Sequence, residues 1–276
     1  MPPPLSPLLL SPALLSMECV VYLDKYKLQG RTAFITGGGR GIGLCSAQAL
    51  AEAGAKVIIS DRDPAVLEEG RATLAKLGYE ADTAVLDVTN SADVTAAADR
   101  FNQTYGAIDI LVANAGIAWP DTGGEEMTDE VWLKVIDIDL NGVFWSCRAF
   151  GRHMLTHGRG AIVTVGSMSG VISNKPQRQA HYNAAKAGVH HLTKSLAAEW
   201  APRGVRVNAV APGYIDTVMS GPAFRTPLGK EWLEMTPMNR IGLPDEIAST
   251  ILFLASDAAS LLTGAIVVAD AGYTIW

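Results

Sequence analysis

The sequence has few cysteines and no concentration of basic side chains. Its three cysteines, Cys19, Cys45 and Cys147, are far apart and match no metal-binding or redox spacing, which predicts free thiols in a reducing compartment. The 22 lysines and arginines are outnumbered by 28 aspartates and glutamates, and no segment collects the basic residues. A nucleic acid is therefore not an expected partner. Because the cysteines predict a reducing compartment, we expect a cytoplasmic protein.

The first residues lack the features of a secretory signal and of a membrane span. No lysine or arginine precedes Lys25, and prolines interrupt the apolar run at the start before it is long enough to cross a bilayer. We expect residues 1–27 to form a disordered or dispensable arm, with Met17 as an alternative start of translation. No linker or internal repeat divides the remainder, so we expect residues 28–276 to form one catalytic domain without membrane association.

The sequence also lacks the motifs of two kinds of catalytic site, the serine-hydrolase site and the metal site. No Gly-x-Ser-x-Gly elbow is present, which argues against serine-hydrolase chemistry. His181, His190 and His191 have no carboxylate or cysteine at ligand spacing, so no catalytic metal site is expected.

What the chain does have is a regular alternation of short apolar runs with longer amphipathic runs. The expected strands are Arg31–Thr36, Lys56–Ser60, Ala81–Leu86, Ile108–Ala113, Ala161–Val165 and Val205–Val210. The expected helices are Ile42–Ala53, Pro64–Leu77, Ser91–Tyr105, Thr128–His157 and Ala180–Trp200. This order predicts an α/β fold: a Rossmann-type, doubly wound parallel sheet of about seven strands, with helices on both faces.

A segment rich in proline and glycine follows the sixth strand, at residues 213–240. Its mixture of apolar and polar residues suits a mobile flap over a substrate pocket. The alternative is a solvent loop with one helical turn.

A glycine turn joins the first expected strand to the first expected helix. Gly37, Gly41 and Gly43 would let the backbone approach a pyrophosphate at the start of the helix. Asp61 ends the second strand about twenty residues later, where a carboxylate can accept hydrogen bonds from a ribose. A carboxylate there favours NAD over NADP, whereas Arg40 in the turn is able to meet a 2′-phosphate.

Tyr182 and Lys186 are four residues apart on one expected helix, so they share one face. A phenol is a poor base near neutral pH, and an adjacent ammonium stabilises its phenolate. The pair indicates proton transfer in alcohol or carbonyl chemistry, although most such pairs are ordinary helix neighbours.

Together these motifs resemble the short-chain dehydrogenase/reductase family over almost the whole chain from residue 28. The motifs that carry the resemblance are Thr36–Gly43, Asp87-Val88, Asn114–Gly116, Asn141, Gly166–Gly170, Tyr182-x-x-x-Lys186, and Pro212-Gly213 with Thr217. The cofactor residues that motif and resemblance imply are Gly37, Arg40, Gly41, Ile42, Gly43, Asp61, Asp87, Val88, Asn114, Ala115, Gly116, Tyr182, Lys186, Pro212, Gly213, Ile215 and Thr217.

The resemblance also implies catalytic roles. Tyr182 would be the general base, Lys186 would lower its pKa and bind the nicotinamide ribose, and Asn141 would hold a water that links the lysine to solvent. The serine that polarises the substrate oxygen is Ser167 by the local Ser-x-x-Gly pattern and Ser169 by its distance from the tyrosine. We favour Ser167, because a loop absorbs an insertion easily.

Three segments resemble the sugar-alcohol dehydrogenases of this family that act on galactitol, arabinitol or mannitol: Gly166–Gly170, His190–Trp200 and Ala271–Trp276. A polyol or ketose is therefore the expected substrate, and its expected contacts are Ser167, Ser169, Gln177, Tyr182 and Tyr214. The alternatives are a 3-oxoacyl thioester reductase or another carbonyl reductase that uses NADPH, and a regulator that binds a dinucleotide without catalysis. The resemblance further implies a homotetramer, with a C-terminal carboxylate that is able to meet a structural divalent ion.

Overall fold

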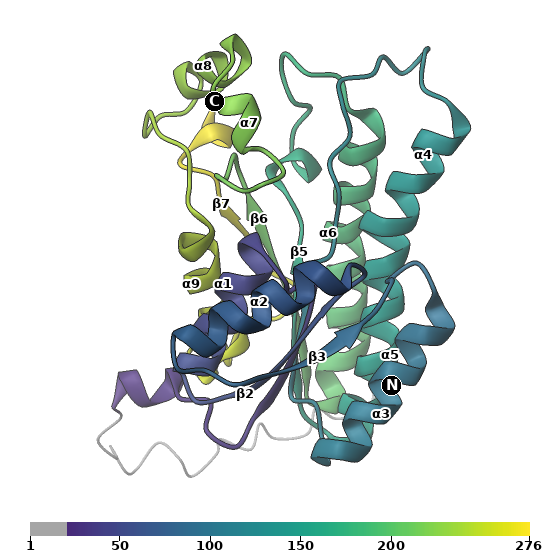
Figure 1. The fold of residues 1–276 in the computed structure, drawn as a ribbon, viewed down its shortest axis with the longest axis vertical. Coiled ribbons are helices and arrows are strands. Elements are labelled where there is room, and N and C mark those ends of the chain that lie inside the picture. The colour runs from purple at the N-terminus through teal and green to yellow at the C-terminus, as the bar shows by residue number, and fades with distance from the viewer. Residues whose placement is uncertain (1–20) are drawn as a thin grey trace, which may run out of the picture.

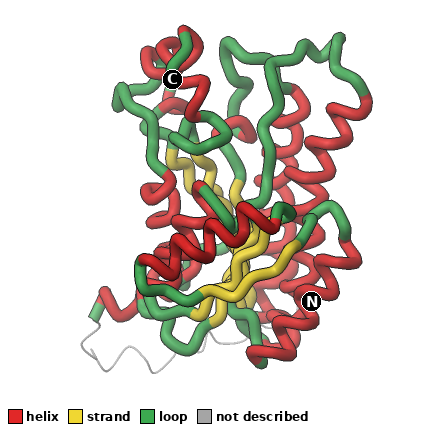
Figure 2. Tube along the Cα trace, viewed as in Figure 1, coloured by secondary structure: helices red, strands yellow, loops and turns green. Residues whose placement is uncertain are grey.

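Seven parallel strands form the centre of the molecule, in the order β3-β2-β1-β4-β5-β6-β7 (Figures 1 and 2). The computed structural model describes residues 21–276 of the chain. The strands are β1 (Thr32–Thr36), β2 (Lys56–Asp61), β3 (Ala81–Val85), β4 (Ile110–Ala113), β5 (Gly160–Val165), β6 (Val205–Pro212) and β7 (Ile266–Ala269). The strand order reverses between β1 and β4, so a crevice opens beyond their carboxyl ends.

Helices cover both faces of this sheet (Figure 1). They are α1 (Gly41–Glu52), α2 (Pro64–Lys76), α3 (Ser91–Tyr105), α4 (Asp129–Ile136), α5 (Gly142–His157), α6 (Ala180–Trp200), α7 (Gly221–Phe224), α8 (Pro227–Glu234) and α9 (Pro244–Ala255). One apolar core lies under α1, α2 and α9, and a second lies under α3, α5 and α6. Because both faces are covered, the central strands are buried along their whole length, and the predicted α/β fold is confirmed.

The long helix expected over Thr128–His157 is divided by a π-helical segment. This segment, Asp137–Asn141, lies between α4 and α5. A π turn adds a residue to the helical repeat, so the side chains that follow it face a different direction from those of an unbroken α-helix. The helix Ala180–Trp200, in contrast, has the bounds that the sequence pattern predicts.

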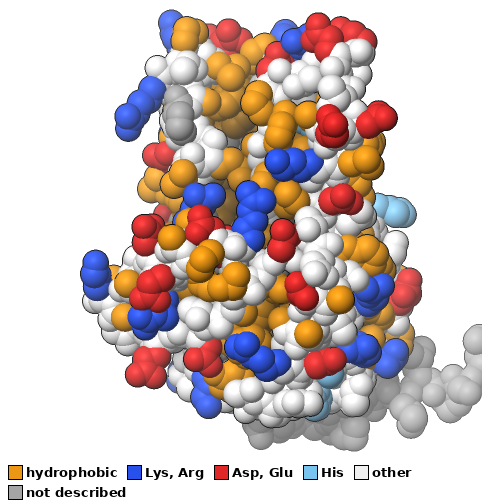
Figure 3. All heavy atoms as spheres, turned by 45° about the vertical axis from the view of Figure 1, so that its right-hand side comes forward, with side chains coloured by type: hydrophobic (Ala, Val, Ile, Leu, Met, Phe, Trp, Pro, Cys, Tyr) orange, Lys and Arg blue, Asp and Glu red, His pale blue; other side chains and the backbone are white. Residues whose placement is uncertain are grey.

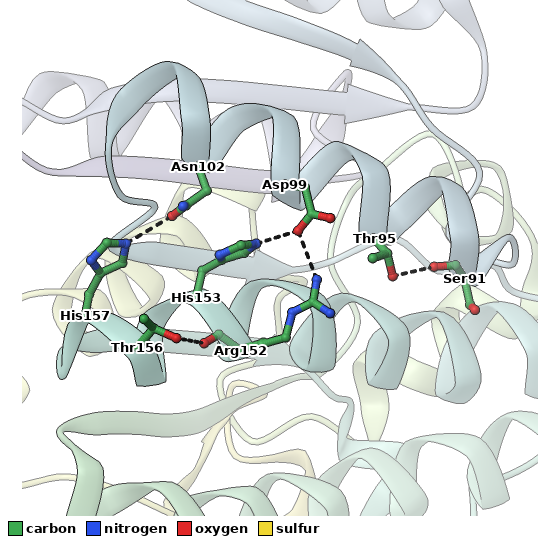
Figure 4. A network of polar contacts seen from close by, with 8 residues as sticks. All are labelled: Ser91, Thr95, Asp99, Asn102, Arg152, His153, Thr156 and His157. Carbon is green, nitrogen blue, oxygen red and sulfur yellow. Dashed lines mark hydrogen bonds and ion pairs between the residues drawn. The ribbon is translucent and has the colours of Figure 1, made fainter.

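Helices α3 and α5 are joined by polar contacts on the outside of the sheet (Figure 4). The Oδ1 atom of Asp99 accepts a 2.9 Å hydrogen bond from Nη2 of Arg152 and lies 2.7 Å from Nε2 of His153. One turn further on, Nε2 of His157 lies 3.2 Å from Oδ1 of Asn102. These partly exposed contacts join two helices that pack beside one another, and none of their residues lines the cavity described below.

The segment of residues 213–240 contains two short helices, α7 and α8, and the end of the chain packs beside them (Figure 1). The indole Nε1 of Trp276 donates a 3.0 Å hydrogen bond to the carbonyl of Met235. The ring of Tyr273 meets that of Tyr214 edge-on at 5.2 Å between centroids. The C-terminus and the predicted flap therefore form one packed unit.

Residues 1–20 of the expected arm over residues 1–27, with Cys19 among them, lie outside the described residues. The rest of the arm contains a 3-10 helix, Tyr22–Tyr26. Within residues 21–276, no helix combines the length and the apolar character needed to cross a membrane. Cys45 and Cys147 are free thiols, as predicted.

Candidate active site

A cavity of about 810 Å³ opens at the carboxyl end of the sheet. Its walls come from the loops after five strands, from the start of α6 and from the flap of residues 213–240. Basic and acidic side chains are interspersed over the face seen in Figure 3, and hydrophobic side chains gather in its upper part. The cavity lies beside the reversal of strand order, which is where open α/β sheets bind ligands.

The glycine turn forms the floor of one half of the cavity. Gly37 and Gly41 have φ angles of 61° and 56°, a region that side chains with a Cβ rarely adopt. Gly43 does not line the cavity: a Cβ there would lie only 2.2 Å from the carbonyl oxygen of Gly37. The helix can therefore start directly under the turn, with its free N–H groups near the cavity.

Asn114 holds this turn against the end of β4. Its side-chain amide donates to the carbonyls of Thr36 and Gly37 at 2.9 and 3.0 Å. The hydroxyl of Thr36 accepts hydrogen bonds from the backbone N–H groups of Asn114 and Ala115. Asn114 thus fixes the two strand ends that flank the crevice.

Acidic and basic side chains lie together beyond β2. Asp61 and Arg40 line the cavity as predicted, and Arg62 lines it as well. Arg62 could not be predicted from the sequence, because an arginine after a strand belongs to no motif. Beyond β3, Asp87 and Val88 also line the cavity, and the Asp87 carboxylate accepts a 2.9 Å hydrogen bond from the N–H of Thr89.

The first half of α6 places Tyr182 and Lys186 together, one turn apart, in the cavity wall. The ammonium of Lys186 lies 5.5 Å from the centre of the Tyr182 ring. It donates a 3.1 Å hydrogen bond to the carbonyl of Val165, at the end of β5, and lies 3.3 Å from the Oδ1 atom of Asp139. Both charged groups of this ion pair are buried.

Opposing effects act on the Tyr182 phenol. Burial raises the pKa of Tyr182 above its ordinary value, and the charge of Asp139 adds to that rise. The ammonium of Lys186 and a hydrogen bond with Ser167 lower the pKa of Tyr182. At Lys186, burial opposes the charged form, but Asp139 and Tyr182 together hold the pKa of the ammonium above its usual value. Lys186 therefore stays positively charged beside the phenol.

Both candidate serines line the cavity, on the short turn after β5. The Ser167 hydroxyl accepts a 3.1 Å hydrogen bond from the N–H of Ser169, and the Ser169 hydroxyl accepts one of 3.3 Å from the amide of Gln179. Behind this turn, Nε2 of His190 lies 3.5 Å from the backbone N of Ser167. Burial lowers the pKa of His190 to about 4, so its ring is neutral near pH 7.

The structure does not bring Asn141 to the catalytic group. Asn141 is not among the residues that line the cavity, and its amide donates a 2.8 Å hydrogen bond to Asp137 in the same π-helical segment. The residue of this segment that contacts Lys186 is Asp139, which was not predicted from the sequence. Its position depends on the π turn, which no sequence pattern indicated.

The far half of the cavity is lined by polar and aromatic side chains. The amide of Gln177 donates a 2.7 Å hydrogen bond to the hydroxyl of Tyr214 and accepts one of 3.0 Å from the indole of Trp232. The Tyr214 and Trp232 rings stack with centroids 4.0 Å apart. The amide of Gln179 donates a 2.9 Å hydrogen bond to Asn174. Trp232, Gln179 and Asn174 were not selected from sequence, because they reach the cavity only through tertiary packing.

The cavity thus contains every predicted cofactor residue except Gly43 and every predicted substrate contact. Pro212, Gly213, Ile215 and Thr217 line it where β6 passes into the flap. Among residues 21–276, no group of three or more His, Cys, Asp or Glu side chains is placed to hold a metal ion. The divalent ion that the resemblance implies for the C-terminal carboxylate at a subunit contact stays a prediction.

Known proteins resemble this chain over nearly its whole length. A family model described as Enoyl-(Acyl carrier protein) reductase matches residues 37–274. Galactitol 2-dehydrogenase of Rhizobium johnstonii is 52% identical over 259 residues, which cover 92% of this chain and 99% of the relative. The crystal structure of a short-chain type dehydrogenase/reductase from Mycobacterium marinum matches with a TM-score of 0.88 and 40% identity, over 92% of this chain and 99% of that one.

The chain belongs to the short-chain dehydrogenase/reductase family. The family, the fold and the enzyme class predicted from the sequence are thereby confirmed. The crystal structure of a gluconate 5-dehydrogenase from Burkholderia cenocepacia J2315 in complex with NADP and tartrate matches with a TM-score of 0.87 and 37% identity, over 92% of this chain and 99% of that one. Members of this family use NAD or NADP, so the nucleotide is established only as one of the two.

Proposed function

We propose that this protein oxidises a secondary hydroxyl of a sugar alcohol to the corresponding ketose and catalyses the reverse reduction. The observation that carries the proposal is the placement of Tyr182, Lys186 and Ser167 in one cavity with a group of hydrogen-bonding side chains. The likeness to a galactitol 2-dehydrogenase at 52% identity supports the same substrate class.

Each catalytic residue has a role that its contacts support. Tyr182 accepts the hydroxyl proton of the substrate, and Ser167 holds the same oxygen by a hydrogen bond. Lys186 stabilises the phenolate of Tyr182, and its own position is fixed by Val165 and Asp139. A bound nicotinamide dinucleotide supplies the acceptor for the hydride. In the reverse direction, Tyr182 returns the proton to the oxygen of the ketose.

The remaining hydroxyls of a polyol match the far half of the cavity. Gln177, Tyr214 and Ser169 present an amide, a phenol and a hydroxyl there, and all three take part in hydrogen bonds with one another or with neighbouring amides. A site that pairs its polar groups with substrate hydroxyls rejects an alcohol that leaves them unpaired. This matches a polyhydroxylated substrate better than the acyl chain of a 3-oxoacyl thioester.

We propose NAD as the preferred nucleotide, held along the glycine turn, Asp61, Asp87-Val88 and Asn114–Gly116. Asp61 supports this choice, because its carboxylate would repel a 2′-phosphate. Arg40 and Arg62 are the opposing groups. Replacing Asp61 by asparagine is expected to raise kcat/KM with NADP relative to NAD, and an unchanged ratio would count against the assignment.

The proposed reaction is tested by the rate of reduced nucleotide formation over a panel of polyols and of simple secondary alcohols. Oxidation of polyols supports the proposal, and oxidation confined to simple alcohols rejects it. Reduction of 3-oxoacyl thioesters with NADPH would favour the rival enzyme. Nucleotide binding without turnover of any alcohol would instead indicate a non-catalytic regulator.

We also propose that the flap of residues 213–240 opens and closes over the substrate, and that the protein assembles as a homotetramer in the cytoplasm. Support for assembly comes from exposed apolar side chains at the end of the chain: Ile275 and Trp276 are 71% and 86% exposed, and Val268 on the edge strand β7 is 40% exposed. Burial of such residues between subunits is favourable. Light scattering of the purified protein tests the assembly, and a monomer would reject it.

A further inference from the structure

The π-helical segment Asp137–Asn141 directs one carboxylate into the protein behind the catalytic pair. Asp139 is fully buried, whereas Asp137 in the same segment is exposed. The Oδ1 atom of Asp139 accepts a 3.1 Å hydrogen bond from the N–H of Ile117 and lies 3.3 Å from the ammonium of Lys186. A π turn is a frequent feature of functional sites.

The turn after β4 is shaped to admit this carboxylate. A Cβ at Gly116 would lie 2.4 Å from Oδ1 of Asp139 and 3.4 Å from the ammonium of Lys186. Glycine is therefore needed where the backbone passes the ion pair. One carboxylate thus joins the loop after β4 to the lysine of α6, and both elements line the cavity.

The charge of Asp139 opposes the effect of Lys186 on the phenol. A lone ammonium beside Tyr182 would favour the phenolate, but a carboxylate beside that ammonium cancels part of its field. In agreement, Asp139 raises the pKa of both Tyr182 and Lys186. Burial raises the pKa of Asp139 itself, and the nearby charge of Lys186 only partly offsets this rise.

Two more titratable groups on α6 face this region. His181 is fully buried, and neither of its ring nitrogens has a hydrogen-bond partner among the described residues. The same holds for Oδ2 of Asp139. His181 lies near enough to Asp139 to act on its carboxylate, and Nε2 of His190 lies 3.5 Å from the backbone N of Ser167, in the turn after β5. Among the described residues, Lys186 and Asp139 act directly on the Tyr182 phenol, His181 acts on Asp139, and His190 is affected by Lys186.

We propose that Asp139 is a positioning residue of the reaction: it fixes the ammonium of Lys186, and its negative charge sets the pH range in which Tyr182 accepts a proton. The carboxylate keeps Tyr182 in its phenol form up to a higher pH than Lys186 alone would allow. Alcohol oxidation is thereby confined to more alkaline conditions, and a protonated Tyr182 remains available for the reverse reduction near neutral pH.

The test replaces Asp139 by asparagine, which keeps the shape and the acceptor oxygen but removes the charge. The pH dependence of kcat/KM for alcohol oxidation is measured, because its acid limb reports the base in the free enzyme. The acid limb is expected to move to lower pH by about one unit. Asp137→Asn is the matched control: it removes a negative charge from the same segment on its exposed side and should leave the profile unchanged.

The kinetic arm rests on the proposed function, so a second readout is independent of any substrate. Formation of tyrosinate with rising pH is followed by ultraviolet difference absorbance. The absorbance change that the wild type shows and Tyr182→Phe does not show belongs to Tyr182. This change should appear at lower pH in Asp139→Asn than in the wild type. If the wild type oxidises no alcohol, the proposed function is wrong. If only Asp139→Asn has no turnover, its pH profile cannot be measured. In both cases the tyrosinate titration still decides the role of Asp139.

A profile or titration that does not move, or that moves to higher pH, overturns the proposal. Circular dichroism and nucleotide binding confirm that each variant is folded. Asp139→Ser, which also removes the charge, takes the place of Asp139→Asn if the latter does not fold.

Discussion

The Nζ atom of Lys186 lies 5.5 Å from the centre of the Tyr182 ring, and a backbone carbonyl and a buried carboxylate also hold it. The ammonium is therefore held in place before any ligand arrives. A cation held in place beside a phenol stabilises the phenolate without a cost of reorganisation during the reaction.

Replacing Tyr182 by phenylalanine removes the proton acceptor and leaves the ring. We expect kcat for alcohol oxidation to fall about a thousandfold, within the range that general acid–base catalysis contributes. Nucleotide binding, measured by fluorescence titration, should change much less, because the glycine turn and the loops after β2 and β3 are untouched. Turnover close to the wild-type value in a folded variant would contradict the role of Tyr182.

The two serines of the turn after β5 differ in their contacts, and this separates their expected effects. Ser167 is coupled to the phenol, since a hydrogen bond with it lowers the pKa of Tyr182. Ser169 is instead held by the amide of Gln179. We expect Ser167→Ala to lower kcat about a hundredfold, as does the loss of a hydrogen-bond donor to a reacting oxygen. Ser169→Ala should act mainly on KM, and the reverse pattern in steady-state kinetics would exchange the two roles.

His190 makes the stability of the protein dependent on pH. Burial lowers its pKa from the usual 6.5 to about 4, so between these values the unfolded chain binds a proton that the native protein does not. The free energy of unfolding should therefore decrease as the pH falls from 6.5 to 4, by up to about 3 kcal/mol from this residue. Above pH 6.5 this contribution is constant.

Urea unfolding of His190→Gln should show a weaker decrease over the same interval. His191→Gln is the matched control, because the next histidine of α6 is exposed. Equal pH dependence in both variants would show that His190 is not the group responsible.

The features that could be predicted from the sequence are those set by residues close together in the chain. The parallel sheet and the helix Ala180–Trp200 follow from periodic apolar patterns, and Tyr182 and Lys186 meet because residues four apart share a helix face. The glycine turn was found because its backbone geometry requires glycine at Gly37 and Gly41.

The features that sequence did not reveal depend on tertiary structure. Asp139 reaches Lys186 only because the helix changes to a π turn, whereas the family resemblance implied that Asn141 acts on the lysine. Trp232 meets Gln177 because α8 of the flap packs over a loop 55 positions away in the chain. Neither contact leaves a periodic signal that a single sequence displays.

Gln177 offers the most direct test of substrate class. Its amide bonds both the Tyr214 hydroxyl and the Trp232 indole, so it can present either end to a hydroxyl-rich ligand. Replacing it by leucine removes about one net hydrogen bond, and we expect KM for a polyol to rise about tenfold with little change in kcat. KM for a simple secondary alcohol should not rise, because such a substrate has no further hydroxyl to pair.

Gln103→Leu, on the exposed side of α3, is the control for a surface change of the same kind. Equal rises for both substrates would mean that Gln177 only supports the cavity wall, whereas a rise confined to the polyol would place its extra hydroxyls against this amide.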